Sequence, residues 1–152
     1  MKYDSYLLTA LIKLVEGTII SPAASVFTDQ HSRILMLANA ERAKIGIQPL
    51  KLNSALCKLA ESKSQEMVER NYFSHQSPDR GSAFDMMRSN GINYTVAGEN
   101  LAIVQNADHA HIAWMNSKTH KENILNPNFT EIGIGICSKG NNSYVCTQMF
   151  IG

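Results

Sequence analysis

Two histidines and a glutamate from three separate segments are the residues best suited to chemistry in this chain. NYFSH ends in His75, AGENLA contains Glu99, and WMNSKTH ends in His120. Two histidines from distant segments can bind zinc through their neutral ring nitrogens, while a carboxylate or a water molecule completes the tetrahedron. The sequence therefore offers His75 and His120 as ligands of a divalent metal, with Glu99 beside them.

Ser117 adds an alternative based on nucleophilic catalysis. It precedes His120 by three residues, and Glu99 is available to hold the imidazole, so the parts of a serine hydrolase triad are present. No glycine-rich nucleophile elbow surrounds Ser117, and no pair of backbone amides is evident for an oxyanion hole. We therefore expect no catalytic residue, and we keep a hydrolase built from Ser117, His120 and Glu99 as the alternative.

The sequences and the order of the three segments resemble motifs of the CAP superfamily of cysteine-rich secretory, antigen 5 and pathogenesis-related 1 proteins. The likeness is to its short bacterial branch and extends over about Ser32–Gly152; three motifs in the right order are far more specific than one. The resemblance implies a single-domain α/β/α sandwich with a central, mainly antiparallel sheet. It also implies a cleft with two histidines and two acids, in which His75, Glu99 and His120 match three positions. Ser117 stands where the second acid is expected.

The resemblance further implies a secreted or surface-exposed binding protein rather than an enzyme. His75, Glu99, Ser117 and His120 would line its cleft, and the expected ligands are lipids, sterols or partner proteins. Without the second acid, two neutral histidines and one carboxylate still leave room for zinc with a water ligand, although the binding should be weaker. We expect no cofactor to be required for folding. A second alternative is a non-catalytic interaction protein of the cell envelope with a vestigial cleft.

Length and composition limit the other classes of function. A chain of 152 residues with 44% hydrophobic residues fits one main domain that buries about two thirds of its unfolded surface. The 14 Lys and Arg residues nearly balance the 13 Asp and Glu residues, so no basic surface is expected to attract nucleic acid. No apolar run reaches the roughly 20 residues of a membrane-spanning helix.

Helical patterns precede strand patterns along the domain, which we assign to residues 32–152. We expect a helix over 34–45 that ends at Gly46, and a second helix capped by Asn53. Ser82, with Asp85 three residues later, resembles a capping box.

A further helix and a terminal hairpin complete the expected elements. Asp108 is predicted to cap the helix, and residues 132–136 and 145–151 alternate like two paired strands. Glu99, judged without the family, would be an acid in a loop. Helices followed by a hairpin indicate a layered α/β domain.

The cysteines give an indication of the cellular compartment in which the protein is found. If Asn141 and Asn142 form a two-residue turn, the register places Cys137 opposite Cys146, where a disulfide fits. The secreted nature of the resembled family also favours this bridge. It would add about 2 kcal/mol or less and indicate an oxidising, extracellular or cell-surface location. Two buried thiols in a reducing compartment are the alternative, and Cys57 is expected to be a small core residue.

Residues 1–31 form an N-terminal extension with two interpretations. Apolar residues between Leu8 and Ile19 recur at helical spacing, which favours an amphipathic helix packed on the domain. The apolar run over 6–20, followed by small residues at 22–24, is the basis for an export leader instead. Asp4 and the charges within the run fit a leader poorly, so the helix is preferred.

Overall fold

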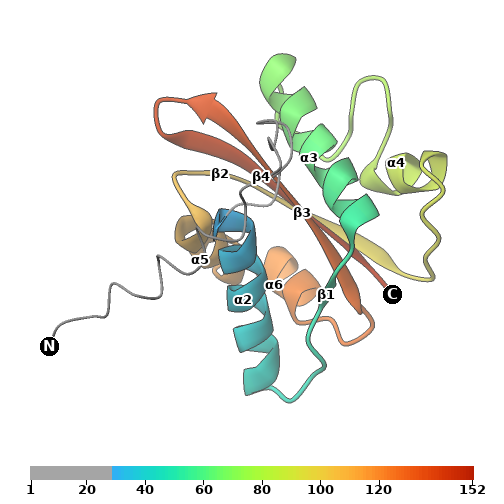
Figure 1. Cartoon of the computed structure of the whole chain (residues 1–152), viewed down its shortest axis with the longest axis vertical. Helices are drawn as coiled ribbons and strands as arrows, with labels where there is room; N and C mark the ends of the chain where they lie inside the picture. Colours follow the sequence, from blue (N-terminus) through green and yellow to red (C-terminus); the bar gives the residue numbers. More distant parts are fainter. Residues whose placement is uncertain (1–28) are drawn as a thin grey trace, which may run out of the picture.

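The computed structural model describes residues 29–152, so the helix or leader expected within the first 28 residues lies outside the described part. The first described helix begins at Asp29, before the predicted start at residue 34. In chain order, the elements are α2 (Asp29–Lys44), β1 (Lys51–Leu52), α3 (Ser54–Glu69), α4 (Ala83–Ser89), β2 (Ala97–Val104), α5 (Ala107–Met115), α6 (Lys118–Ile124), β3 (Glu131–Gly140) and β4 (Ser143–Ile151) (Figure 1).

The elements form three layers around one sheet. Its strand order is β1-β3-β4-β2; β1 runs parallel to β3, whereas the other neighbours are antiparallel. Helices α3 and α4 cover one face, and α2, α5 and α6 cover the other (Figure 1). The expected α/β/α sandwich with a mainly antiparallel sheet is confirmed.

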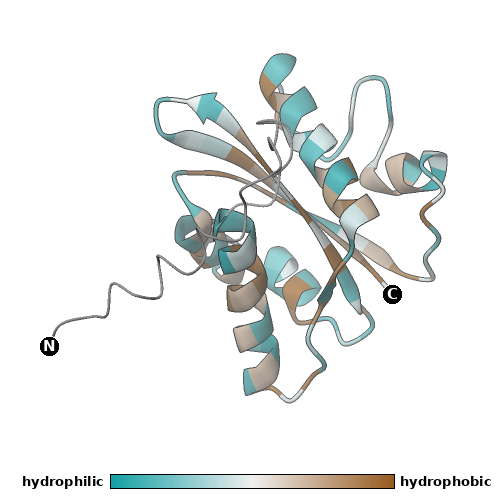
Figure 2. Cartoon of the chain, viewed as in Figure 1, coloured by the Kyte–Doolittle hydropathy of each residue, from teal (hydrophilic) through white to brown (hydrophobic). Residues whose placement is uncertain are grey.

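Alternation along β3 explains how helices pack on both faces. Ile132 and Ile134 are fully buried in the cluster shared with α2, α5 and α6. Gly133 and Gly135 point the other way, where a Cβ on either residue would overlap the backbone of α3. The glycines therefore let α3 pack directly on the strand. Figure 2 shows the resulting pattern, with hydrophobic strand centres between the helices and a more hydrophilic hairpin tip.

Local capping signals are mostly confirmed. The side chain of Asn53 accepts a backbone N–H in the first turn of α3, and Ser82 and Asp85 form the reciprocal bonds of a capping box at α4. The cap predicted at Asp108 is wrong. Asn106 caps α5 instead, and Asp108 lies within the first turn of that helix.

The disulfide predicted between Cys137 and Cys146 is also wrong. The hairpin does turn at Asn141 and Asn142, both with positive φ, but a register shift between Ser138 and Gly140 intervenes. This bulge pairs Cys137 with Val145, and Cys146 with Ile136. Because adjacent strand residues point to opposite faces, the two thiols lie on opposite sides of the sheet, and all three cysteines are free.

Side chains of α5 and α6 cover the outer edge of β2. The indole Nε1 of Trp114 donates to the carbonyl of Leu101 at 3.0 Å, and the amide of Asn123 donates to the carbonyl of Glu99 at 3.3 Å. These bonds satisfy carbonyls that an edge strand would otherwise expose. They also fix α6 beside the segment that contains Glu99.

Arg42 anchors the C-terminal end of α6 to α2. Its fully buried guanidinium donates to the carbonyls of Gln48, Ile124, Asn126 and Phe129 at 2.8–2.9 Å. Burial lowers the pKa of Arg42. Four backbone acceptors replace the water that this charge loses, so Arg42 fixes the end of α6 and the segment after it to α2.

Candidate functional site

His75 and Glu99 form the centre of the site. Nδ1 of His75 lies 2.7 Å from Oε1 of Glu99, although 24 residues separate them in the sequence. The histidine side chain is 62% exposed, whereas that of Glu99 is only 3% exposed. A buried carboxylate thus holds a solvent-accessible imidazole in a fixed orientation.

Strand β2 sets the position of Glu99. The AGENLA segment is a strand and not the loop that its composition suggests, and Glu99 pairs across the sheet with Met149. This register directs Glu99 to the face covered by α3 and α4. The neighbouring Asn100 points to the other face, where its amide donates to the carbonyl of His120 at 3.0 Å.

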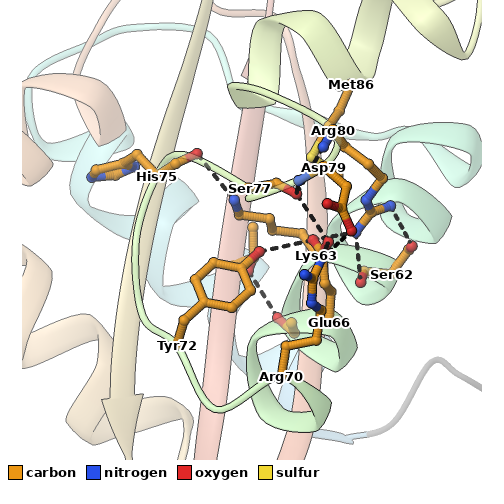
Figure 3. Close-up of polar contacts among 12 residues, drawn as sticks. Ser62, Lys63, Glu66, Arg70, Tyr72, His75, Ser77, Asp79, Arg80 and Met86 are labelled. Carbon is orange, nitrogen blue, oxygen red and sulfur yellow. Dashed lines mark hydrogen bonds and ion pairs between the residues drawn. The ribbon is translucent and has the colours of Figure 1, made fainter.

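Lys63 fixes the loop that presents His75. This lysine is fully buried in α3, and its Nζ donates to the backbone carbonyl of His75 at 3.0 Å. Figure 3 shows the lysine reaching the carbonyl while the imidazole projects away from the cluster. The ammonium also lies 5.6 Å from the ring centre of Tyr72. Burial lowers the pKa of Lys63, an effect that Glu99 and Glu66 oppose.

Glu66 joins three points of the same loop. It accepts hydrogen bonds from the hydroxyls of Tyr72 and Ser77 and from the guanidinium of Arg80, at 2.8–2.9 Å (Figure 3). Burial by itself would raise the pKa of Glu66, but these bonds outweigh it and lower the pKa to about 2. Burial and the bond to Glu66 raise the pKa of Tyr72 to about 12. Glu66 therefore stays ionised and clamps the loop near neutral pH.

Sequence reasoning did not identify Lys63 or Glu66. One signal was present, because Lys63 falls between Leu59 and Met67 on the apolar stripe of its helix. A lysine at such a position must either reach solvent or find a buried partner.

His120 supplies the second imidazole from α6. The pKa of His120 is lowered, first by burial and then by the charge of His75, so the two rings share one electrostatic environment. His75 shows the opposite effect, because its hydrogen bond to Glu99 raises its pKa. Near neutral pH, His120 is therefore the more readily neutral of the two and can offer a lone pair.

Ser117 and the acids near it do not complete a tetrad or a triad in this geometry. The Ser117 hydroxyl lies 3.3 Å from that of Thr119, and the ring that Glu99 holds is His75. Glu131, an acid near His120 in the sequence, accepts from Asn53 instead. Within residues 29–152, no group of three or more His, Cys, Asp or Glu side chains is placed to hold a metal ion.

A cavity of about 310 Å³ opens beside the His75–Glu99 pair. It lies along the edge of β2, between the start of α4 and the side of α6. Its lining residues are His75, Ser82, Ala83, Phe84, Ala97, Gly98, Glu99 and Asn123. The site thus has a polar end at the histidine and a small, mostly apolar chamber next to it.

Relatives of known sequence share most of this domain. Residues 35–150 match the model of the CAP family, described as the cysteine-rich secretory protein family. The protein YkwD of Bacillus subtilis (strain 168), named as uncharacterized, is 49% identical over 131 residues. That match covers 86% of this chain and 50% of YkwD, so the chain spans about half the length of this relative.

Solved structures agree with the sequence matches. An extracellular protein containing a SCP domain from Bacillus anthracis str. Ames superposes with a TM-score of 0.73 and 32% identity, over 79% of this chain and 39% of that one. An outer surface protein from Borrelia burgdorferi gives a TM-score of 0.72 at 20% identity, over 82% and 95% of the two chains. The second likeness concerns the fold alone. With its three motifs, its sandwich and a family match over most of its length, the chain belongs to the CAP family of cysteine-rich secretory proteins.

Proposed function

We propose that this CAP domain is a non-catalytic binding module whose cleft holds a divalent cation, with zinc expected, through His75 and His120. The hydrogen bond between Glu99 and His75 is the observation that carries the proposal. By accepting the Nδ1 proton, the carboxylate leaves Nε2 of His75 with a lone pair for a metal. A neutral His120 nearby would supply the second nitrogen.

The two proposed ligands, His75 and His120, would leave the coordination shell of zinc incomplete. Oε2 of Glu99 is buried and accepts no hydrogen bond within the described residues, so the carboxylate has unused capacity. Ser117 provides no charge in place of the second acid, and water or a ligand atom would complete the coordination. When bound, zinc would supply a positive, Lewis-acidic centre at the mouth of the cleft.

The geometry supports binding over serine hydrolysis. A triad requires the serine to bond the histidine and the acid to hold that same histidine. Here Ser117 contacts Thr119, and Glu99 holds His75 rather than His120. Labelling of Ser117 by a serine-reactive probe, lost in Ser117→Ala, would instead support the hydrolase.

The proposed location is outside the cell or on its surface. The name of the Bacillus anthracis structure, which is 32% identical, describes an extracellular protein. No helix within residues 29–152 has the length and hydropathy of a membrane span. The volume of the cavity, about 310 Å³, lies at the lower end of the range for small-molecule sites, which favours a compact ligand or lipid headgroup over a whole sterol.

Calorimetric titration of the metal-free protein with zinc at neutral pH tests the proposal. One binding site is expected in the wild type and none in His75→Ala/His120→Ala. The matched control is His109→Ala, because His109 is exposed and its ring bonds Gln105. Equal zinc binding by the wild type and the double variant, or no zinc binding by the wild type, would contradict the metal site.

A further inference from the structure

Glu99, which lines the cavity beside His75, has one buried carboxylate oxygen without a hydrogen-bond donor among the described residues. Glu99 uses Oε1 to hold His75, while Oε2 is buried and accepts no hydrogen bond within the described part of the chain. A buried carboxylate oxygen without a partner costs about 1–3 kcal/mol or more. Since Glu99 lines the cavity, a ligand there could supply the missing donor.

Asn123 offers a second acceptor on the same lining. Its Nδ2 donates to the carbonyl of Glu99 at 3.3 Å and to Oδ1 of Asn100 at 2.8 Å, and these bonds orient the amide. The opposite atom, Oδ1, accepts no hydrogen bond among the described residues. It lies against Gly98, where an added Cβ would come within 3.1 Å of it. Glycine at this position leaves room for the amide oxygen and for the ring of Phe129, whose nearest atom would lie 2.9 Å from an added Cβ.

Phe84 gives the cavity an aromatic surface. Its side chain is 39% exposed although it lines the cavity, and Ala83, Ala97 and Gly98 add small apolar groups around it. The chamber therefore presents two hydrogen-bond acceptors together with a partly exposed ring. A matching ligand carries donors on one edge and C–H groups on a flat face.

The charges near Glu99 decide between a neutral and a cationic donor. The buried ammonium of Lys63 interacts with Glu99, and the ring of His75 is hydrogen-bonded to it. The ammonium of Lys63 already compensates the charge of the carboxylate, so a second ammonium in the cavity would be repelled by it. Hydroxyl groups satisfy the same oxygen without this repulsion.

We infer that the cavity binds a neutral polyhydroxylated ligand, namely a single sugar unit. One hydroxyl donates to Oε2 of Glu99, a second donates to Oδ1 of Asn123, and the C–H face of the ring packs on Phe84. This inference names a ligand class for the proposed binding module and rests on that function. Its two hydrogen-bonding residues, Glu99 and Asn123, are not the proposed zinc ligands, although His75 also lines the cavity, so zinc and sugar binding are tested separately.

The test is a titration of the isotope-labelled, metal-free full chain, followed by backbone amide chemical shifts. The probes are the methyl glycosides of glucose, galactose, mannose and N-acetylglucosamine, with n-butylammonium and cyclohexylmethanol for comparison. At least one glycoside should shift the amides of Gly98 and Glu99 at millimolar concentration, and the two comparison probes should not.

Variants assign the binding to this cavity. Glu99→Gln replaces the free acceptor by a donor and should weaken glycoside binding by about tenfold or more, as expected for losing a bond to a charged group. Phe84→Ala should weaken it several-fold. Phe73→Ala is the matched control, because Phe73 is a similarly exposed phenylalanine, at 47%, outside the cavity lining.

Three results would overturn the inference: no shift with any glycoside, equal or tighter binding of a comparison probe, or glycoside binding unchanged in both Glu99→Gln and Phe84→Ala. A separate zinc titration keeps the two proposals distinct. Glycoside binding without zinc binding would contradict only the proposed metal site. Zinc binding without glycoside binding would contradict only the proposed sugar site.

Discussion

Nδ1 of His75 lies 2.7 Å from Oε1 of Glu99, so an exposed loop residue is tied to a buried residue of the sheet. The carboxylate of Glu99 cannot move far, because β2 is paired with β4 and the backbone carbonyl of Glu99 accepts a hydrogen bond from Asn123. The imidazole therefore takes its orientation from the core of the fold. This explains how a solvent-exposed histidine can still present one defined nitrogen to a ligand.

Glu99→Gln should lower the pKa of His75, because the hydrogen bond and charge of the carboxylate raise it in the wild type. With the folded pKa above the ordinary 6.5, the pair stabilises the protein below that value and loses its contribution as the pH rises through the folded pKa. Solvent screening of the exposed ring limits the effect to about 1 kcal/mol. Histidine titration by NMR checks the pKa, and chemical denaturation at acidic and alkaline pH checks the stability.

The control for this variant is Glu122→Gln, which removes an exposed carboxylate elsewhere on the surface. It should leave the pKa of His75 unchanged. An unchanged His75 pKa in Glu99→Gln would show that the carboxylate does not hold the ring in solution.

Lys63→Met should release the loop between α3 and α4. The variant keeps the apolar stem but leaves the carbonyl of His75 without its buried donor. We expect faster amide hydrogen exchange over residues 71–80 and a loss of about 1–3 kcal/mol in the free energy of unfolding. Lys58→Met, an exposed change on the same helix, should leave the exchange in that loop as it is. Equal loop protection in the wild type and Lys63→Met would contradict this role.

Arg42→Met should be strongly destabilising. It removes donors to four backbone carbonyls, two of which are buried along with the guanidinium. The expected loss is about 3–5 kcal/mol in the free energy of unfolding, as for breaking other buried charged contacts. Arg33→Met removes an exposed pair with Asp108 and should cost much less than Arg42→Met. Similar losses of unfolding free energy from the two variants in denaturant melts would contradict this structural role of Arg42.

The cysteines should remain thiols even under oxidising conditions. Cys137 and Cys146 face opposite sides of the sheet, and burial raises the pKa of Cys146 to about 12, which suppresses its reactive thiolate. After air oxidation and denaturation without reductant, alkylation should add three groups, as measured by mass spectrometry. A mass that shows only one modified cysteine would instead indicate the disulfide.

Features governed by local chemistry were predictable from the sequence. The caps at Asn53 and Ser82 depend on residues within one helical turn, and the turn at Asn141 depends on residues that tolerate positive φ. The three family motifs likewise led to His75 and Glu99, which the structure brings together.

Features governed by long-range packing were not predictable in the same way. The bulge near Lys139 shifts the hairpin by one residue, and a one-residue shift is enough to separate Cys137 from Cys146. The acceptor of the Lys63 ammonium is a backbone carbonyl, which cannot be predicted from the type of any residue. Asn106 and Asp108 both suit a helix cap, and only the course of the chain after β2 selects Asn106.

The most direct test of the proposed site is the crystal structure of the protein soaked with zinc, with anomalous scattering used to locate the metal. We predict zinc at about 2.0–2.1 Å from one ring nitrogen each of His75 and His120, with Glu99 still bonded to Nδ1 of His75. Zinc bound elsewhere, or a Glu99 carboxylate turned away from His75 in the zinc-bound crystal, would contradict the account.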